Sequence, residues 1–105
     1  MNQITKEMAQ NFHEEEEEAI KSLIQAAGFD PDNTDVQSFK DKGFSIKTFK
    51  PQPLETMFVL AYQNEFVAGS IVSLNFELGQ IKRTVIPHFN DLDEKYHKFV
   101  KGTIQ

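Results

Sequence analysis

The chain has 105 residues, 39% of them hydrophobic and ten of them Phe, so it has enough apolar surface for one core and too few residues for two. It contains no cysteine, which excludes disulfides, thiolate nucleophiles and thiolate metal sites. Sixteen Asp and Glu residues outnumber eleven Lys and Arg residues, and the resulting net charge of −5 argues against direct binding to a nucleic-acid backbone.

The first expected element is a helix over residues 11–27. Asn11 followed by Glu14 has the form of a capping box, and Gly28 stands where a glycine commonly ends a helix. Apolar residues recur at helical spacing in the second half of the segment, at Ile20, Leu23, Ile24 and Ala27. Residues 1–10 precede the cap, and we expect them to fray.

A second, shorter helix is expected over residues 35–42, with Thr34 as its N-cap. From residue 44 the apolar pattern changes to the period of two that is typical of strands. Turn residues divide this region into four segments, which are residues 44–50, 54–62, 66–77 and 81–86. The second segment is apolar on both faces in its later half, as in a central strand. In the third, Gly69 and Ser70 indicate a bulge or a close approach of two backbones.

These elements predict a single α+β domain over residues 1–105. It has two N-terminal helices, a four-stranded antiparallel meander and a short C-terminal helix that begins at Asn90 or Asp91 and ends at Gly102. The buried face of that last helix is expected to contain Leu92, Tyr96, Phe99 and Val100. We expect the helices to form a single layer on one face of the sheet.

Neither a membrane span nor a secretory signal is visible. The longest apolar stretch, MFVLAY, is far shorter than the roughly 20 residues that a transmembrane helix needs. The N-terminal segment MNQITKEMAQ lacks a basic start followed by an apolar block. We therefore expect a cytoplasmic protein that makes no contact with a membrane.

Five consecutive glutamates, residues 14–18, equal the whole negative excess of the chain. Near a helix N-terminus each one stabilises the helix by about 0.3–1 kcal/mol, which gives the run a purely structural interpretation. However, Glu16 and Glu17 fall in the same helical sector as Ile20, where an unpaired charge is costly to bury. We therefore expect the first turns to extend past the core into solvent, where a cationic partner can reach them. The residues predicted to bind that partner are His13, Glu14, Glu15, Glu16, Glu17 and Glu18.

The acidic helix predicts a small non-enzymatic interaction protein that binds a basic surface of a partner protein. Adaptors belong to this class, and so do inhibitors encoded by phages and other mobile elements, whose target surface normally holds nucleic acid. An alternative is a cystatin-like or NTF2-like shape whose concave sheet face binds a small apolar ligand. The residues predicted to line that face are Phe44, Phe58, Phe66 and Phe76. A homodimer is a further alternative if the long third strand lies at a sheet edge.

The remaining candidate sites do not match an established motif. His13 with Glu17 and Asp93 with His97 are i,i+4 pairs that suit a metal, but HEEEE lacks the second His of the zinc-protease signature. Residues 30–41 lack the Gly and the final Glu of a calcium loop. The chain has no nucleophile elbow and no phosphate-binding loop. We expect no metal site, no cofactor and no enzymatic activity.

One segment resembles a known family. Residues 58–76, FVLAYQNEFVAGSIVSLNF, are similar to the central hairpin of the GNAT acetyltransferases, and TVIPHF is similar to the segment that follows it there. In that family a glycine-rich loop then binds the pyrophosphate of acetyl-CoA at a helix N-terminus. Here the corresponding residues are NDLDEKYH, which have no glycine and three acids. The resemblance therefore implies a degenerate acetyltransferase-like hairpin fold without activity.

Overall fold

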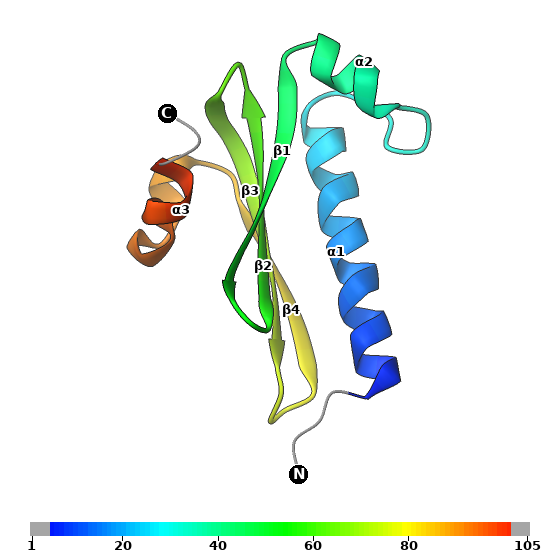
Figure 1. Cartoon of the computed structure of the whole chain (residues 1–105), viewed down its shortest axis with the longest axis vertical. Coiled ribbons are helices and arrows are strands. Elements are labelled where there is room, and N and C mark those ends of the chain that lie inside the picture. Colours follow the sequence, from blue (N-terminus) through cyan, green and yellow to red (C-terminus); the bar gives the residue numbers. More distant parts are fainter. Residues whose placement is uncertain (1–4, 102–105) are drawn as a thin grey trace.

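The computed structural model describes residues 5–101 of the chain. A long helix, α1 (Lys6–Ala26), and a short one, α2 (Val36–Asp41), precede the strands. The strands are β1 (Phe44–Gln52), β2 (Glu55–Tyr62), β3 (Glu65–Asn75) and β4 (Gln80–Ile86). The described chain then ends in the 3-10 turns η1 (Phe89–Asp91) and η2 (Glu94–Tyr96) and the helix α3 (His97–Lys101), as Figure 1 shows.

The strands form an antiparallel sheet in the order β1-β2-β3-β4, which confirms the predicted α+β class and the meander. The β2–β3 hairpin turns at Gln63 and Asn64, whose φ values of 50° and 67° are those of the turn that suits a two-residue hairpin loop. Because β3 pairs on both sides, it is not an edge strand, so the condition on which a homodimer through the third strand was expected is not met. The edge strands are β1 and β4.

Helices cover both faces of the sheet, so the predicted single layer is wrong. In Figure 1, α1 and α2 lie on one side of the sheet and α3 lies on the other. The reason is that β2 buries side chains alternately on both faces: Phe58 and Leu60 pack in the cluster under α1, whereas Met57 and Val59 pack under the C-terminal segment. An apolar face exposed to water is unfavourable, so the short C-terminal elements cover the second one.

The first helix begins earlier than expected. Thr5 is its N-cap, and the Thr5 hydroxyl accepts a hydrogen bond from the Met8 backbone N–H at 3.1 Å. Residues 6–10 are therefore helical, which corrects the expectation that residues 1–10 fray; residues 1–4 lie outside the described part. At the other end the chain turns at Gly28, whose φ of 89° belongs to the left-handed region that favours glycine.

Two smaller expectations are also refined. α2 is capped by Asp35 rather than Thr34, with the Ser38 backbone N–H donating to the Asp35 carboxylate at 2.7 Å. The bulge of β3 lies at Val67, where the register with β2 shifts, and not at Gly69. Gly69 is instead a close approach, because a Cβ placed there would lie 3.3 Å from the Phe58 carbonyl oxygen.

The C-terminal segment is less helical than expected but is buried as predicted. It forms two 3-10 turns before a helix of five residues. Leu92, Tyr96 and Val100 are buried, and Phe99 packs against the same cluster while partly exposed. The predicted helix end at Gly102 lies outside the described part. Among residues 5–101, none of the helices combines the length and apolarity needed to cross a membrane.

Candidate functional site

The acidic run divides between the sheet and the solvent. On one flank of α1, Glu15 forms an ion pair with Arg83 of β4, with 3.0 Å between Oε2 and Nη1. On the other flank, Glu16 accepts a hydrogen bond from the Thr56 hydroxyl at 2.7 Å, and its carboxylate lies 4.0 Å from Lys50 Nζ. Two of the glutamates predicted to bind a partner therefore contact the protein's own sheet.

The expectation that the first turns extend past the core is wrong. Phe12 packs against the cluster under α1, and the Glu16 side chain is only 22% exposed. The helix thus follows the sheet into its N-terminal half. The charged sector is tolerated because β1 and β2 supply a cation and a hydroxyl at that position, which is how a partly buried carboxylate is normally accommodated.

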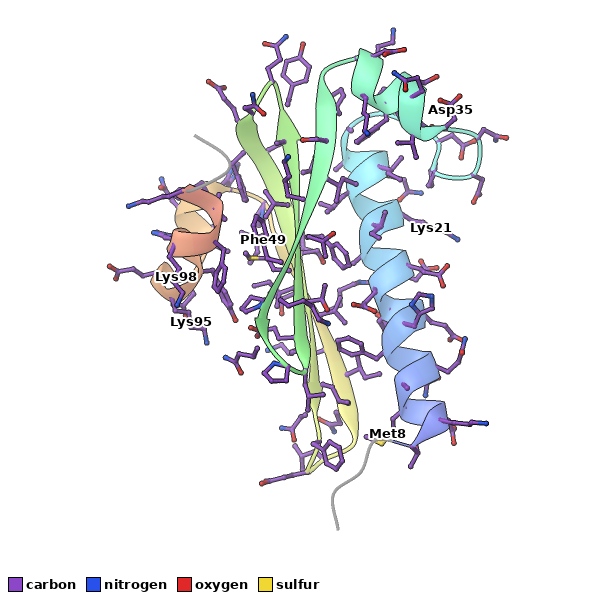
Figure 2. The ribbon with its side chains drawn as sticks, in the orientation of Figure 1. Met8, Lys21, Asp35, Phe49, Lys95 and Lys98 are labelled. Carbon is purple, nitrogen blue, oxygen red and sulfur yellow. The ribbon has the colours of Figure 1, made fainter. Side chains whose placement is uncertain are left out.

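The other three glutamates of the run, Glu14, Glu17 and Glu18, face solvent, and we call them the outer acidic ridge. Glu17 contacts His13 at 3.0 Å, and Glu14 accepts a hydrogen bond from the Gln10 side chain at 3.3 Å. The Glu18 side chain makes neither a hydrogen bond nor an ion pair within residues 5–101. Lys21 lies on the outer side of α1 in Figure 2, yet none of the three carboxylates forms an ion pair with it.

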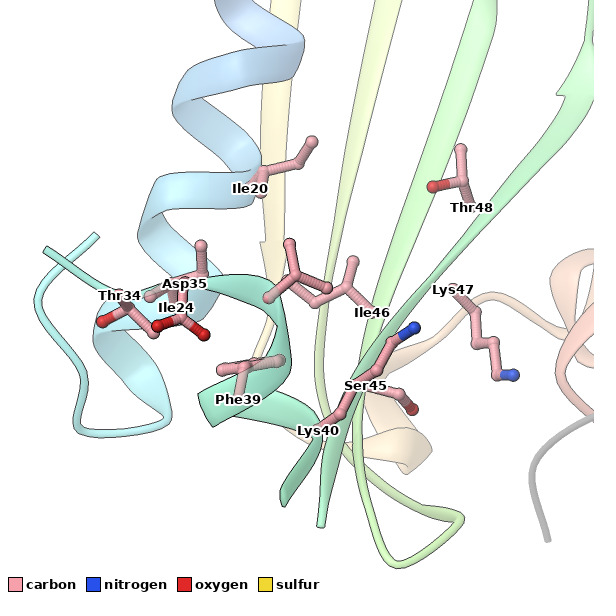
Figure 3. A pocket seen from close by; sticks show the side chains of 11 residues that line it. Ile20, Ile24, Thr34, Asp35, Phe39, Lys40, Ser45, Ile46, Lys47 and Thr48 are labelled. Atoms are coloured by element: carbon pink, nitrogen blue, oxygen red, sulfur yellow. The ribbon is translucent and has the colours of Figure 1, made fainter. Parts of the chain in front are cut away.

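A groove of about 470 Å³ opens between α1, α2 and β1. Its walls are formed by Ile20 and Ile24 of α1, Val36 and Phe39 of α2 and Ile46 of β1. Figure 3 shows Ile20 and Ile46 on opposite walls. The groove exists because α1 packs mainly on β3, with β2 and β4 beneath its edges, and so leaves the α1-side face of β1 to the much shorter α2.

Three charged residues border this groove, and they differ in where their charges lie. The Asp35 carboxylate caps α2, and its hydrogen bonds from the backbone and hydroxyl of Ser38 hold its pKa below the ordinary value. Lys47 of β1 lies directly opposite Val59 of β2, whose side chain packs under the C-terminal segment on the other face of the sheet. The Lys47 side chain therefore points away from the groove. Lys40 extends from α2 alongside Ile46 in Figure 3, and it has no ion-pair partner within the described residues.

The phenylalanines predicted to line one apolar pocket do not share one. Phe44 and Phe58 pack in the cluster under α1, whereas Phe66 packs on the other face against Phe89 with ring centroids 5.6 Å apart. Phe76 lies in the turn between β3 and β4. None of the four borders the groove, whose aromatic residue is Phe39. The alternation along separate strands identified these residues as apolar but did not determine which face each one occupies.

A buried polar pair on the opposite face was not anticipated. Tyr96 donates a hydrogen bond from its hydroxyl to Glu55 Oε2 at 2.8 Å, and the two residues are 6% and 9% exposed. Burial, followed by the hydrogen bond and charge of Glu55, raises the pKa of Tyr96 to about 12. The other carboxylate oxygen of Glu55 accepts no hydrogen bond from the described part of the chain. The alternation of Glu55 with Met57 and Val59 would have indicated its inward position.

The candidate metal pairs are used in local contacts. His97 contacts the Leu92 carbonyl at 3.0 Å and stacks on Phe89, and Asp93 accepts a hydrogen bond from the Lys95 backbone. Asp30 receives hydrogen bonds from Asp32 and Asn33 in a turn. Within residues 5–101 the structure brings no three His, Asp or Glu side chains together in a way that suits a metal ion.

Comparison with protein-family models, with curated proteins and with solved structures finds no match. The function must therefore be argued from the charged and apolar surfaces of this α+β fold.

Proposed function

We propose that this protein is a non-enzymatic interaction module that binds a basic surface of a partner protein through the outer acidic ridge, Glu14, Glu17 and Glu18. The observation that carries the proposal is their common exposure at i, i+3 and i+4 on one face of α1, without a lysine or arginine partner in the described chain. An inhibitor that covers the nucleic-acid-binding surface of its target is one form of such a module.

The ridge is unfavourable for the isolated helix, which supports a role in binding. Glu14 and Glu18 are four residues apart, and like charges at this spacing destabilise a helix by about 0.2–0.5 kcal/mol. Glu15 and Glu16 escape a comparable cost because the sheet supplies Arg83, Thr56 and Lys50. A cationic partner surface would supply the equivalent contacts for the ridge. Its association would be accelerated by the charge and weakened by salt.

The test compares two variants of equal charge. In the ridge variant, Glu14→Gln, Glu17→Gln and Glu18→Gln are combined. In the control variant, three exposed acids elsewhere are replaced, Glu65→Gln, Glu77→Gln and Glu94→Gln. Both variants are checked for native circular dichroism and then used, with the unchanged protein, to capture partners from an extract of the native host.

A supporting result is a protein retained by the unchanged chain and the control variant but lost by the ridge variant, with an affinity that falls as salt rises. Measured on the purified pair, the ridge variant should bind about tenfold more weakly, because three exposed ion pairs contribute about 0.2–1 kcal/mol each. If all three proteins retain the same partner with equal affinity, the ridge is not the interface.

A further inference from the structure

We propose that the groove between α1, α2 and β1 binds a small amphipathic anion, with an apolar tail between the isoleucines and a carboxylate at Lys40. This site is separate from the outer acidic ridge and does not depend on the function proposed for it. Medium-chain fatty carboxylates are the simplest members of the ligand class.

The walls of the groove suit an apolar chain. Its volume of about 470 Å³ lies within the range of about 300–1,000 Å³ that is typical of small-molecule sites. Ile20, Ile24 and Ile46 supply branched aliphatic surface from two different elements. Val36 at the rim is 71% exposed, which leaves apolar surface for a ligand to cover.

The α2 wall is held in place without a ligand. Phe39 of α2 packs on Phe29 with ring centroids 5.3 Å apart and on Phe44 at 5.4 Å. These contacts fix α2 to the turn after α1 and to the start of β1. A wall that is already ordered reduces the conformational entropy lost on binding.

The charges around the groove select an anion and fix its direction. The Lys40 ammonium lies beside Ile46 and lacks an ion-pair partner among residues 5–101. The Asp35 carboxylate is occupied by the α2 cap, at the side of the groove near Ile24 in Figure 3. Further along the same flank of α1, Glu17 precedes Ile20 by one turn and would repel a carboxylate. The head group is therefore favoured at Lys40, with the tail toward Ile20.

Binding is tested with two probes that share a ten-carbon tail and differ in charge, decanoate and decyltrimethylammonium. Each is titrated into the full chain labelled with ¹⁵N, and amide chemical shifts are followed. Decanoate should shift the signals of residues that line the groove, and decyltrimethylammonium should bind less tightly. The signals of the C-terminal segment, which lies on the opposite face of the sheet, serve as internal references in the same spectra.

Two lysines on the same short segment provide a matched comparison. Lys40→Gln removes the charge at the groove, whereas Lys42→Gln removes an exposed charge just after α2 that does not border it. Lys40→Gln should weaken decanoate binding by about threefold to tenfold. This is the range expected for the loss of one ion pair whose exposure lies between that of a surface pair and that of a partly buried pair. Lys42→Gln should leave it unchanged. Val36→Ala, at a 71% exposed position, should weaken both probes to a similar extent.

Three results would overturn the proposal. The first is the absence of groove shifts at about 1 mM decanoate. The second is equal binding of the two probes, or equal effects of Lys40→Gln and Lys42→Gln, which would indicate nonspecific adsorption of the tail. The third is a groove that does not bind decanoate but binds an apolar peptide of a partner protein, which would make it a protein-docking surface instead.

Discussion

The hydrogen-bonded chain that joins α1 to the sheet offers the sharpest prediction. Lys50 Nζ donates to the Thr56 hydroxyl at 2.7 Å, and that hydroxyl donates to Glu16 Oε2 at 2.7 Å. Thr56 is 1% exposed. The substitution Thr56→Val keeps the β-branched shape and removes the hydroxyl, so the packing is retained while both hydrogen bonds are lost.

The expected loss of stability follows from the exposure of the two charged groups. Removing a hydrogen bond to a charged group lowers the free energy of unfolding by about 1.5–3 kcal/mol if the charged group then has no other partner. The Glu16 side chain is 22% exposed, so water can replace part of the hydrogen bond that Glu16 loses. The Lys50 side chain is 55% exposed, so water can replace nearly all of the hydrogen bond that Lys50 loses. We therefore expect Thr56→Val to lower the free energy of unfolding by about 1–2 kcal/mol.

A double-mutant cycle isolates the contact. Unfolding in urea, followed by circular dichroism, is measured for Thr56→Val, Glu16→Ala and the double variant. The coupling free energy between the two sites should be about 1 kcal/mol. Glu17→Ala, at a 56% exposed position of the ridge, is the control and should change stability by less than about 0.5 kcal/mol. A coupling near zero would refute the argument that part of the acidic run is held by the sheet.

Two further predictions concern the face of the sheet covered by the C-terminal segment. The raised pKa of Tyr96, about 12 against the ordinary 10.0, means that the folded state keeps the phenol proton, so this contribution to stability is complete below pH 10 and is lost as the pH rises to 12. It amounts to about 2–3 kcal/mol at 1.36 kcal/mol per unit. In a Tyr62→Phe background, phenolate absorption should titrate near that value, and an ordinary midpoint would contradict the burial of the Glu55 pair. Leu92→Ala, at a 4% exposed site, should cost about 2–5 kcal/mol in urea unfolding, whereas a loss below 1 kcal/mol would mean that the segment does not cover the sheet.

Local patterns predicted the elements of this fold better than their assembly. The period of two after residue 44 and the turn at Gln63 and Asn64 were sufficient for the four strands and the meander. The first helix was predicted to start at Asn11, where the capping-box form of Asn11 and Glu14 precedes the apolar stripe, although Thr5 provides the cap. A stripe marks only the turns that pack on apolar side chains, and the N-terminal turns of α1 are stabilised instead by the cap at Thr5 and the polar contacts of Glu15 and Glu16.

The candidate surfaces were harder to predict because they depend on register and layer. Glu15 and Glu16 are adjacent in sequence, yet one contacts β4 and the other contacts β1 and β2. The helical position of Glu16 beside Ile20 was visible in the sequence, but no local pattern identified its partners or distinguished Glu15 from Glu14 and Glu18. The groove depends on where α1 crosses the sheet, and the spacing of apolar residues in the sequence does not predict that position. The two apolar faces of β2, by contrast, were visible in the sequence and already required a second covering layer.

The acidic ridge and the groove lie next to each other, and their charges make the two proposals separable. Glu17 and Ile20 are three residues apart on α1, so a basic partner on the ridge would approach the tail end of the groove, whereas an anionic ligand places its charge at Lys40 on α2. Gln substitutions on the ridge therefore act on the partner and leave the attraction of the carboxylate to Lys40 in place. Lys40→Gln acts on the ligand and leaves the ridge charge unchanged. If the ridge substitutions strengthened decanoate binding as much as Lys40→Gln weakens it, the carboxylate would lie near Glu17 and the proposed direction of the ligand would be wrong.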